Sequence, residues 1–74
     1  RPKIFYINNT LYISITDLQE EKVYLYYSNG NSVGGFPVYG SSEADLANAD
    51  NDESIELTVM SSDKEILIYQ INEN

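Results

Sequence analysis

Cysteine, histidine and tryptophan are all missing from the 74 residues. Without cysteine no disulfide can staple the fold, and without cysteine or histidine the usual zinc ligands are missing. A Ser-His or Cys-His nucleophile cannot be assembled either. No glycine loop of the P-loop type is present to hold a phosphate. We therefore expect a protein that is not an enzyme and that uses no cofactor.

Basic residues are few: four Lys and Arg face twelve Asp and Glu, which gives a formal net charge of −8. Binding to phosphates needs basic side chains, so direct nucleic-acid binding is not expected. Such a charge keeps a small protein soluble, and it also suits a basic partner, a cation or mimicry of a nucleic-acid surface. Long hydrophobic runs are missing too. None approaches the roughly 20 residues of a membrane-spanning helix, so no membrane span is expected.

What the chain does contain is a series of short stretches in which apolar and polar residues alternate, separated by turn residues. Alternation of this kind is typical of half-buried strands. The expected strands cover residues 3–7, 10–16, 22–28, 33–39, 53–60 and 65–71. They predict an all-β fold in a single domain over residues 1–74. The expected form is a small six-stranded antiparallel β-sandwich (immunoglobulin-like) or a partly open barrel.

The register of the central strands follows from a proposed loop over residues 17–21, which sets Thr16 opposite Lys22. Residues that lie opposite one another share a face of the sheet. The resulting inner face is aliphatic and consists of Leu11, Ile13, Ile15, Val23 and Leu25. Asn29-Gly30 predicts a two-residue type I′ turn, and this turn adds Phe36 and Val38 to the same face.

The reverse face of these strands collects the tyrosines, of which the chain has seven. Tyr12, Tyr24 and Tyr26 would cluster there as cross-strand neighbours. An open face of this kind suits recognition of a protein or a carbohydrate, because tyrosine is enriched at interfaces. If a second layer covers the face, the same tyrosines are core residues with their hydroxyls at the rim.

The strand over residues 33–39 carries Gly34-Gly35, which predicts a bulge or a bend. Pro37 cannot donate a ladder hydrogen bond and therefore indicates a free sheet edge. Assembly by strand pairing at this edge, or at the first strand, is an open possibility.

The segment from residue 40 to residue 53 is acidic and carries no obvious period of two. Ser42 and Asp45 have the spacing of a capping box, which favours at most one short helix over residues 43–49; a mobile acidic loop is the alternative. Calcium prefers alternating oxygen ligands such as those of Asn48-x-Asp50-x-Asp52. The spacing lacks the glycine and glutamate of an EF-hand, so the choice is between a solvated loop and a different calcium site. The candidate ligands are Asp45, Asp50, Asp52 and Glu53.

The last two expected strands form a hairpin in which Met60 lies opposite Glu65. Ile55, Leu57 and Val59 point inward in this arrangement. Ile66 then lies opposite Val59, and Ile68 lies opposite Leu57. The final strand is apolar on both sides, which favours a central or sandwiched position.

Two stretches resemble a known family. The strand over residues 10–15 and the hairpin over residues 22–33 are similar to small immunoglobulin-like domains of unknown function in secreted Bacteroidales proteins, and to the C-terminal sorting domains of such proteins. In that pattern a strand "n-x-L-x-I-x-I" precedes "v-x-v-x-i-x-d-x-x-G-x-x-V", although the glycine of the family's last strand is missing here. The resemblance implies an exported, non-catalytic sandwich. It assigns no functional residues.

The expected function is that of a non-catalytic secreted or surface module for protein or glycan binding or for assembly. The alternative is an acidic inhibitor, or a nucleic-acid mimic, that occupies a basic site on another protein. The expected location is extracellular, periplasmic or at the cell surface. A start at Arg1 rather than methionine is expected of a processed chain.

Overall fold

The computed structural model describes residues 2–47 and 55–71. Every regular element in these residues is a strand, so the expected all-β class is confirmed. There are seven strands rather than six: β1 (Lys3–Ile7), β2 (Thr10–Asp17), β3 (Lys22–Tyr27), β4 (Val38–Tyr39), β5 (Asp45–Ala47), β6 (Ile55–Met60) and β7 (Ile66–Ile71). Within the described segments there is no helix that could cross a bilayer.

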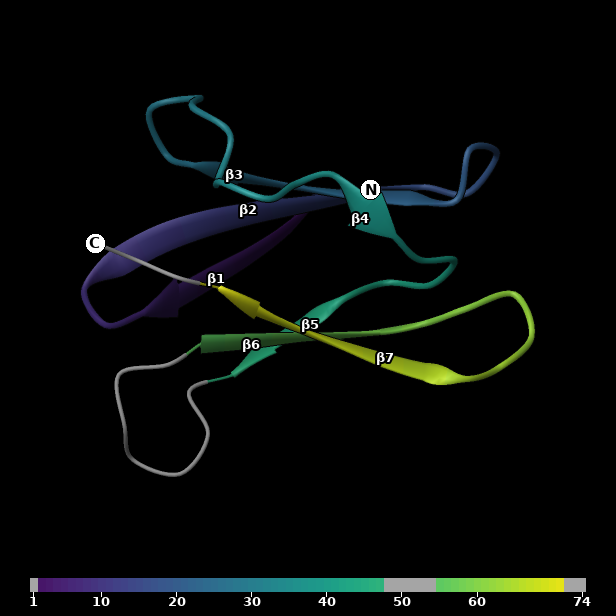
Figure 1. Cartoon of the computed structure of the whole chain (residues 1–74). Coiled ribbons are helices and arrows are strands. Elements are labelled where there is room, and N and C mark those ends of the chain that lie inside the picture. Colours follow the sequence, from purple (N-terminus) through teal and green to yellow (C-terminus); the bar gives the residue numbers. More distant parts are fainter. Residues whose placement is uncertain (1, 48–54, 72–74) are drawn as a thin grey trace.

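The strands form two antiparallel sheets, which Figure 1 shows as two layers. Sheet A has the order β1-β2-β3-β4 and sheet B the order β5-β6-β7. This arrangement is consistent with a small β-sandwich. The immunoglobulin-like connectivity is not confirmed, because that fold exchanges strands between its sheets, whereas here each sheet is built from consecutive strands.

One hydrophobic core joins the two sheets. Sheet A contributes buried Tyr12, Val23 and Leu25, and sheet B contributes buried Leu57 and Val59. Further buried members are Val33, Ala44, Leu46, Ile55 and Ile71, and Phe36 and Val38 pack against the cluster as predicted.

The connection from β4 to β5 crosses from one sheet to the other at Gly40. A Cβ atom at this position would lie 2.8 Å from Cγ2 of Val23 and 2.8 Å from Cγ2 of Val59. Only glycine fits between one valine of each sheet without displacing them. The backbone here is tied to both layers, since Gly40 N–H donates to the carbonyl of Glu21 at 3.0 Å and Ser41 N–H donates to that of Met60 at 2.8 Å.

The predicted register of β2 and β3 is wrong by one residue. Asp17, not Thr16, lies opposite Lys22, because the loop has four residues instead of five. Ser14 therefore faces Leu25 and Thr16 faces Val23. Ser14 and Tyr12 are consequently buried on the core side, and the aliphatic residues of β2 (Leu11, Ile13 and Ile15) lie on the outer side.

The chain does reverse at Asn29-Gly30, but not through the predicted two-residue turn. Gly30 N–H donates to the carbonyl of Tyr27, so the loop consists of residues 28–30, and of these only Gly30 has a positive φ. The two-residue turn occurs instead at Asn8-Asn9, where φ is 54° and 62° and Ile7 lies opposite Thr10. Positive φ at both central residues is the mark of a type I′ turn.

The C-terminal hairpin is also displaced by one residue from its predicted register. Met60 lies opposite Ile66, and Val59 lies opposite Leu67. The inward positions of Ile55, Leu57 and Val59 are confirmed. Ile66 and Ile68 face solvent, however, and β7 is an edge strand rather than a central one.

The predicted helix over residues 43–49 is wrong as far as the structure describes it. Ala44 and Leu46 are buried while Glu43, Asp45 and Ala47 are exposed, which is the period of a strand. Leu46 of β5 lies opposite Leu57 of β6. Burial of these two apolar side chains outweighs the weak capping signal, because two isolated helical turns are marginal without packing.

Candidate functional site

The outer side of sheet A is apolar and is covered by none of the described residues. In cross-strand register, Ile4 lies opposite Ile13, Ile13 lies opposite Tyr26, and Ile15 lies opposite Tyr24. Directly opposed residues share one face of a sheet. We call this surface the apolar outer face; it consists of Ile4, Tyr6, Leu11, Ile13, Ile15, Tyr24 and Tyr26.

The two members that β1 contributes are the most open. Ile4 is 65% exposed and Tyr6 is 68% exposed, and Leu11 and Ile15 are exposed to about half that extent. Contiguous apolar patches on monomers rarely exceed about 300–600 Å², and the largest are often functional.

Tyr24 and Tyr26 form the aromatic part of the apolar outer face. Their ring centroids lie 6.3 Å apart and the ring planes are parallel to within 2°. The two hydroxyls have no hydrogen-bond partner among the residues that the structure describes, so they are open to a ligand. Tyr6 is different, since its hydroxyl donates to Oδ1 of Asn9 at 3.5 Å.

The apolar outer face is uncharged although the chain carries a net charge of −8. The charged side chains nearest to it in register are Asp17 and Lys22, which lie opposite one another at one end. Lys22 Nζ is also 3.9 Å from a carboxylate oxygen of Glu20. The acidic residues of segments 2–47 and 55–71 are therefore kept off this surface.

Of the three predicted ligand-binding tyrosines, the structure brings only Tyr24 and Tyr26 together on this face. Tyr12 lies on the opposite side of the sheet with no exposed surface, and its ring packs 5.7 Å from that of Tyr27. The physical reason is the one-residue difference in register, which turns the even-numbered residues of β2 toward the core.

Of the four predicted calcium ligands, only Asp45 lies within the described residues, where it is an exposed residue of β5. Asp50, Asp52 and Glu53 lie outside the described residues. In residues 2–47 and 55–71, no three acidic side chains are grouped so that they could hold a metal ion.

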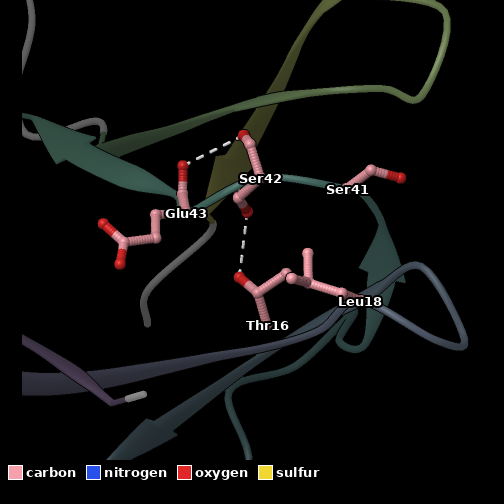
Figure 2. Close-up of a pocket in the computed structure, with 5 residues that line it drawn as sticks. All are labelled: Thr16, Leu18, Ser41, Ser42 and Glu43. Atoms are coloured by element: carbon pink, nitrogen blue, oxygen red, sulfur yellow. Dashed lines mark hydrogen bonds between the residues drawn. The ribbon is translucent and has the colours of Figure 1, made fainter.

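A separate pocket of about 330 Å³ opens beside the connection between the sheets. Figure 2 shows its lining residues: Thr16, Leu18, Ser41, Ser42 and Glu43. Thr16 comes from the end of β2, Leu18 from the following loop, and the other three from the connection.

The polar groups of this pocket serve mainly to hold the connection in place. Thr16 Oγ1 donates to the carbonyl of Ser42 at 3.0 Å (Figure 2). Ser42 Oγ donates to the carbonyl of Glu43 at 3.1 Å and accepts from Met60 N–H at 2.9 Å. Because the proton of Ser42 is directed at a backbone carbonyl, this hydroxyl is not arranged as a nucleophile.

Sequence reasoning missed Ile4, Tyr6, Leu11, Ile13 and Ile15 as surface residues. A signal was present in β1, where Ile4-Phe5-Tyr6-Ile7 is apolar on both sides. A strand of a two-layered protein can bury only one side, so one set of these side chains had to be exposed or covered by a partner.

The chain was compared with protein-family models, curated proteins and solved structures, and none of them matches it. Its function therefore has to be argued from its own surfaces.

Proposed function

We propose that the protein is a non-catalytic binding module that recognises an apolar surface of another protein through the apolar outer face of sheet A. The observation that carries the proposal is an outer face that exposes Ile4 and Tyr6 by about two-thirds. The seven residues of this face carry no charge, although the chain as a whole has a net charge of −8. Interface cores are depleted in charged residues and enriched in aromatic ones.

A protein partner fits this face better than a glycan. Sugars need hydrogen-bonding side chains beside an aromatic ring, because each buried hydroxyl must keep a partner. Four of the seven residues (Ile4, Leu11, Ile13 and Ile15) carry no polar side-chain group. The resemblance to secreted domains supports an extracellular, periplasmic or surface location.

The acidic inhibitor remains the second candidate, since the net charge of −8 supports it. The two proposals differ in how strongly binding depends on salt. Binding of an acidic chain to a basic site weakens as salt screens the attraction. Binding through an uncharged apolar face changes little with salt.

The test is selection of binders from a phage-displayed random peptide library, with an array of immobilised glycans in parallel. We expect apolar peptides whose affinity falls at least tenfold when Tyr24→Thr and Tyr26→Thr are combined, and again with Ile4→Thr. Ile66→Thr is the matched control, because Ile66 is 66% exposed on the other sheet against 65% for Ile4.

Two results would overturn the proposal. One is a set of basic peptides whose binding is lost at high salt and is indifferent to Ile4→Thr. The other is a set of glycans whose binding depends on Tyr24 and Tyr26 while no peptide is enriched.

A further inference from the structure

The four sheet edges differ in how well they are protected against pairing with another strand. Short strands, charges and proline are the usual protection. β4 has only two residues and follows Pro37, β5 has three residues including Asp45, and β1 begins with Lys3. β7 has six residues, Ile-Leu-Ile-Tyr-Gln-Ile, without charge, proline or glycine.

The backbone of β7 alternates in the direction of its hydrogen-bonding groups. Ser61 N–H donates to the carbonyl of Glu65 at 2.8 Å, which makes this a hydrogen-bonded pair. Such pairs alternate along an antiparallel ladder. Leu67 therefore turns its N–H and C=O toward β6, whereas Ile66 and Ile68 turn theirs away from it.

The side chains at this edge are incompletely covered on both sides of the sheet. Ile66 and Ile68 are 66% and 62% exposed on the outer side. Leu67 and Tyr69 are half-buried on the core side. A further strand along β7 would cover all four.

We propose that β7 pairs with β7 of a second copy of this chain, antiparallel and centred on Ile68, so that two copies of sheet B form one continuous sheet. A two-fold axis at Ile68 places the N–H and C=O of this residue opposite those of the same residue in the second copy. It also sets Leu67 opposite Tyr69, an aliphatic–aromatic pair of the kind that stabilises sheets.

The distribution of charge along β7 is compatible with a second copy as the occupant. Two chains of net charge −8 repel one another, and like charges directly opposite in a sheet are destabilising. A two-fold axis at Ile68 pairs residues 66–70 of β7 with one another, and none of these residues is charged. The contact is small, below the ~1,200 Å² of stable complexes, so the dimer should be weak and reversible.

The surface used here is distinct from the apolar outer face of sheet A, so either proposal can fail alone. The test is sedimentation equilibrium of the whole chain at protein concentrations up to about 1 mM. A dimer with a dissociation constant of this order is substantially populated there. We expect a mass that rises toward that of a dimer. Ile68→Lys and Ile68→Glu should each weaken association more than tenfold, because the axis sets like charges opposite one another.

An equimolar mixture of the Lys and Glu variants should associate again, since opposite charges then meet across the axis. The two variants change the net charge in opposite directions, so a loss shared by both cannot arise from net charge. Thr58→Lys is the matched control: Thr58 is the exposed neighbour of Ile68 on β6, away from the edge. It should associate like the unmodified chain.

The proposal is overturned by a chain that stays monomeric throughout, by a Lys variant that still associates, or by a mixture that does not recover. Association that is lost with Ile4→Thr but kept with Ile68→Lys would also overturn it, and would assign self-association to sheet A.

Discussion

At the scale of single residues, Tyr12 is the side chain whose role differs most from its predicted one. The sequence predicts Tyr12 either to bind a ligand on an open face or to be a core residue with its hydroxyl at the rim, and the structure shows a fully buried core residue. Its hydroxyl is buried and has no hydrogen-bond partner among the described residues. An unpaired buried hydroxyl opposes folding, while the ring itself contributes through packing.

Tyr12→Phe should therefore keep or raise the free energy of unfolding, by up to about 1 kcal/mol. Tyr69→Phe is the control, because the hydroxyl of Tyr69 donates to the carbonyl of Tyr39 at 2.9 Å. This second change should cost about 0.5–1 kcal/mol. Urea denaturation measures both, and a larger loss for Tyr12→Phe than for Tyr69→Phe would contradict the assignment.

Gly40 offers a second test at this scale. In Gly40→Ala the new methyl group would meet Val23 and Val59 at under 3.0 Å, so the two sheets must separate locally. Overpacking of this kind costs about 1–3 kcal/mol. Gly34→Ala is the matched control, because no atom lies within 4 Å of its Cβ position. Equal denaturation midpoints for the two variants would show that the connection does not pass between the valines.

At the scale of elements, the positions of the strands could be predicted from alternation, but their registers could not. The loops before β3 and before β7 each hold a residue with a positive φ that is not glycine: Glu21 at 58° and Lys64 at 66°. Glutamate and lysine carry no sequence signal for this conformation. Each loop therefore differs from its predicted length by one residue, and a slip of one residue exchanges the two faces of a strand.

The unpredictable strand register also explains why the candidate site could be predicted only in part. Tyr24 and Tyr26 could be assigned to one face from their spacing alone, whereas their neighbours on β2 depend on the register. β5 is not predicted for another reason: Glu43, Ala44, Asp45 and Leu46 alternate in the sequence, but the apparent capping residues favour a helix.

Lys64→Gly tests the turn before β7. A left-handed conformation costs an L-residue about 1–2 kcal/mol, and glycine adopts it freely. The variant should therefore raise the free energy of unfolding by about 0.5–1 kcal/mol. Asp63→Gly is the control, because Asp63 has no positive φ. The free energy of unfolding of this variant should fall. Stabilisation by Asp63→Gly and not by Lys64→Gly would indicate a different turn.

At the scale of the whole molecule, the separation of charge from apolar surface is the dominant feature. Both outward apolar regions, on sheet A and along β7, are uncharged, and the described acidic residues lie in loops, at the end of β2 and on β5 and β6. In the described segments the one ion pair, between Lys22 and Glu20, is exposed and 3.9 Å long, so it contributes little. Repulsion among the acidic residues should therefore outweigh attraction.

Salt should consequently stabilise the protein. Raising NaCl from about 0.01 M to about 0.1 M shortens the Debye length from about 30 Å to about 10 Å, and the free energy of unfolding should rise by on the order of 1 kcal/mol. Urea denaturation at a low protein concentration measures this without a contribution from self-association. A fall in stability over the same range would mean that attractive pairs dominate.

The proposed function depends on which side of β2 faces the core, and one measurement decides it: a two-dimensional NOESY spectrum of the α-protons of β2 and β3. Leu25 accepts its hydrogen bond from Val33, on the side away from β2, so Ser14 and Leu25 form a close pair without ladder hydrogen bonds between them. We predict strong α-proton contacts between Ser14 and Leu25 and between Thr16 and Val23. Contacts from Ile13 to Leu25 and from Ile15 to Val23 would instead bury the aliphatic residues of β2 and remove the apolar outer face.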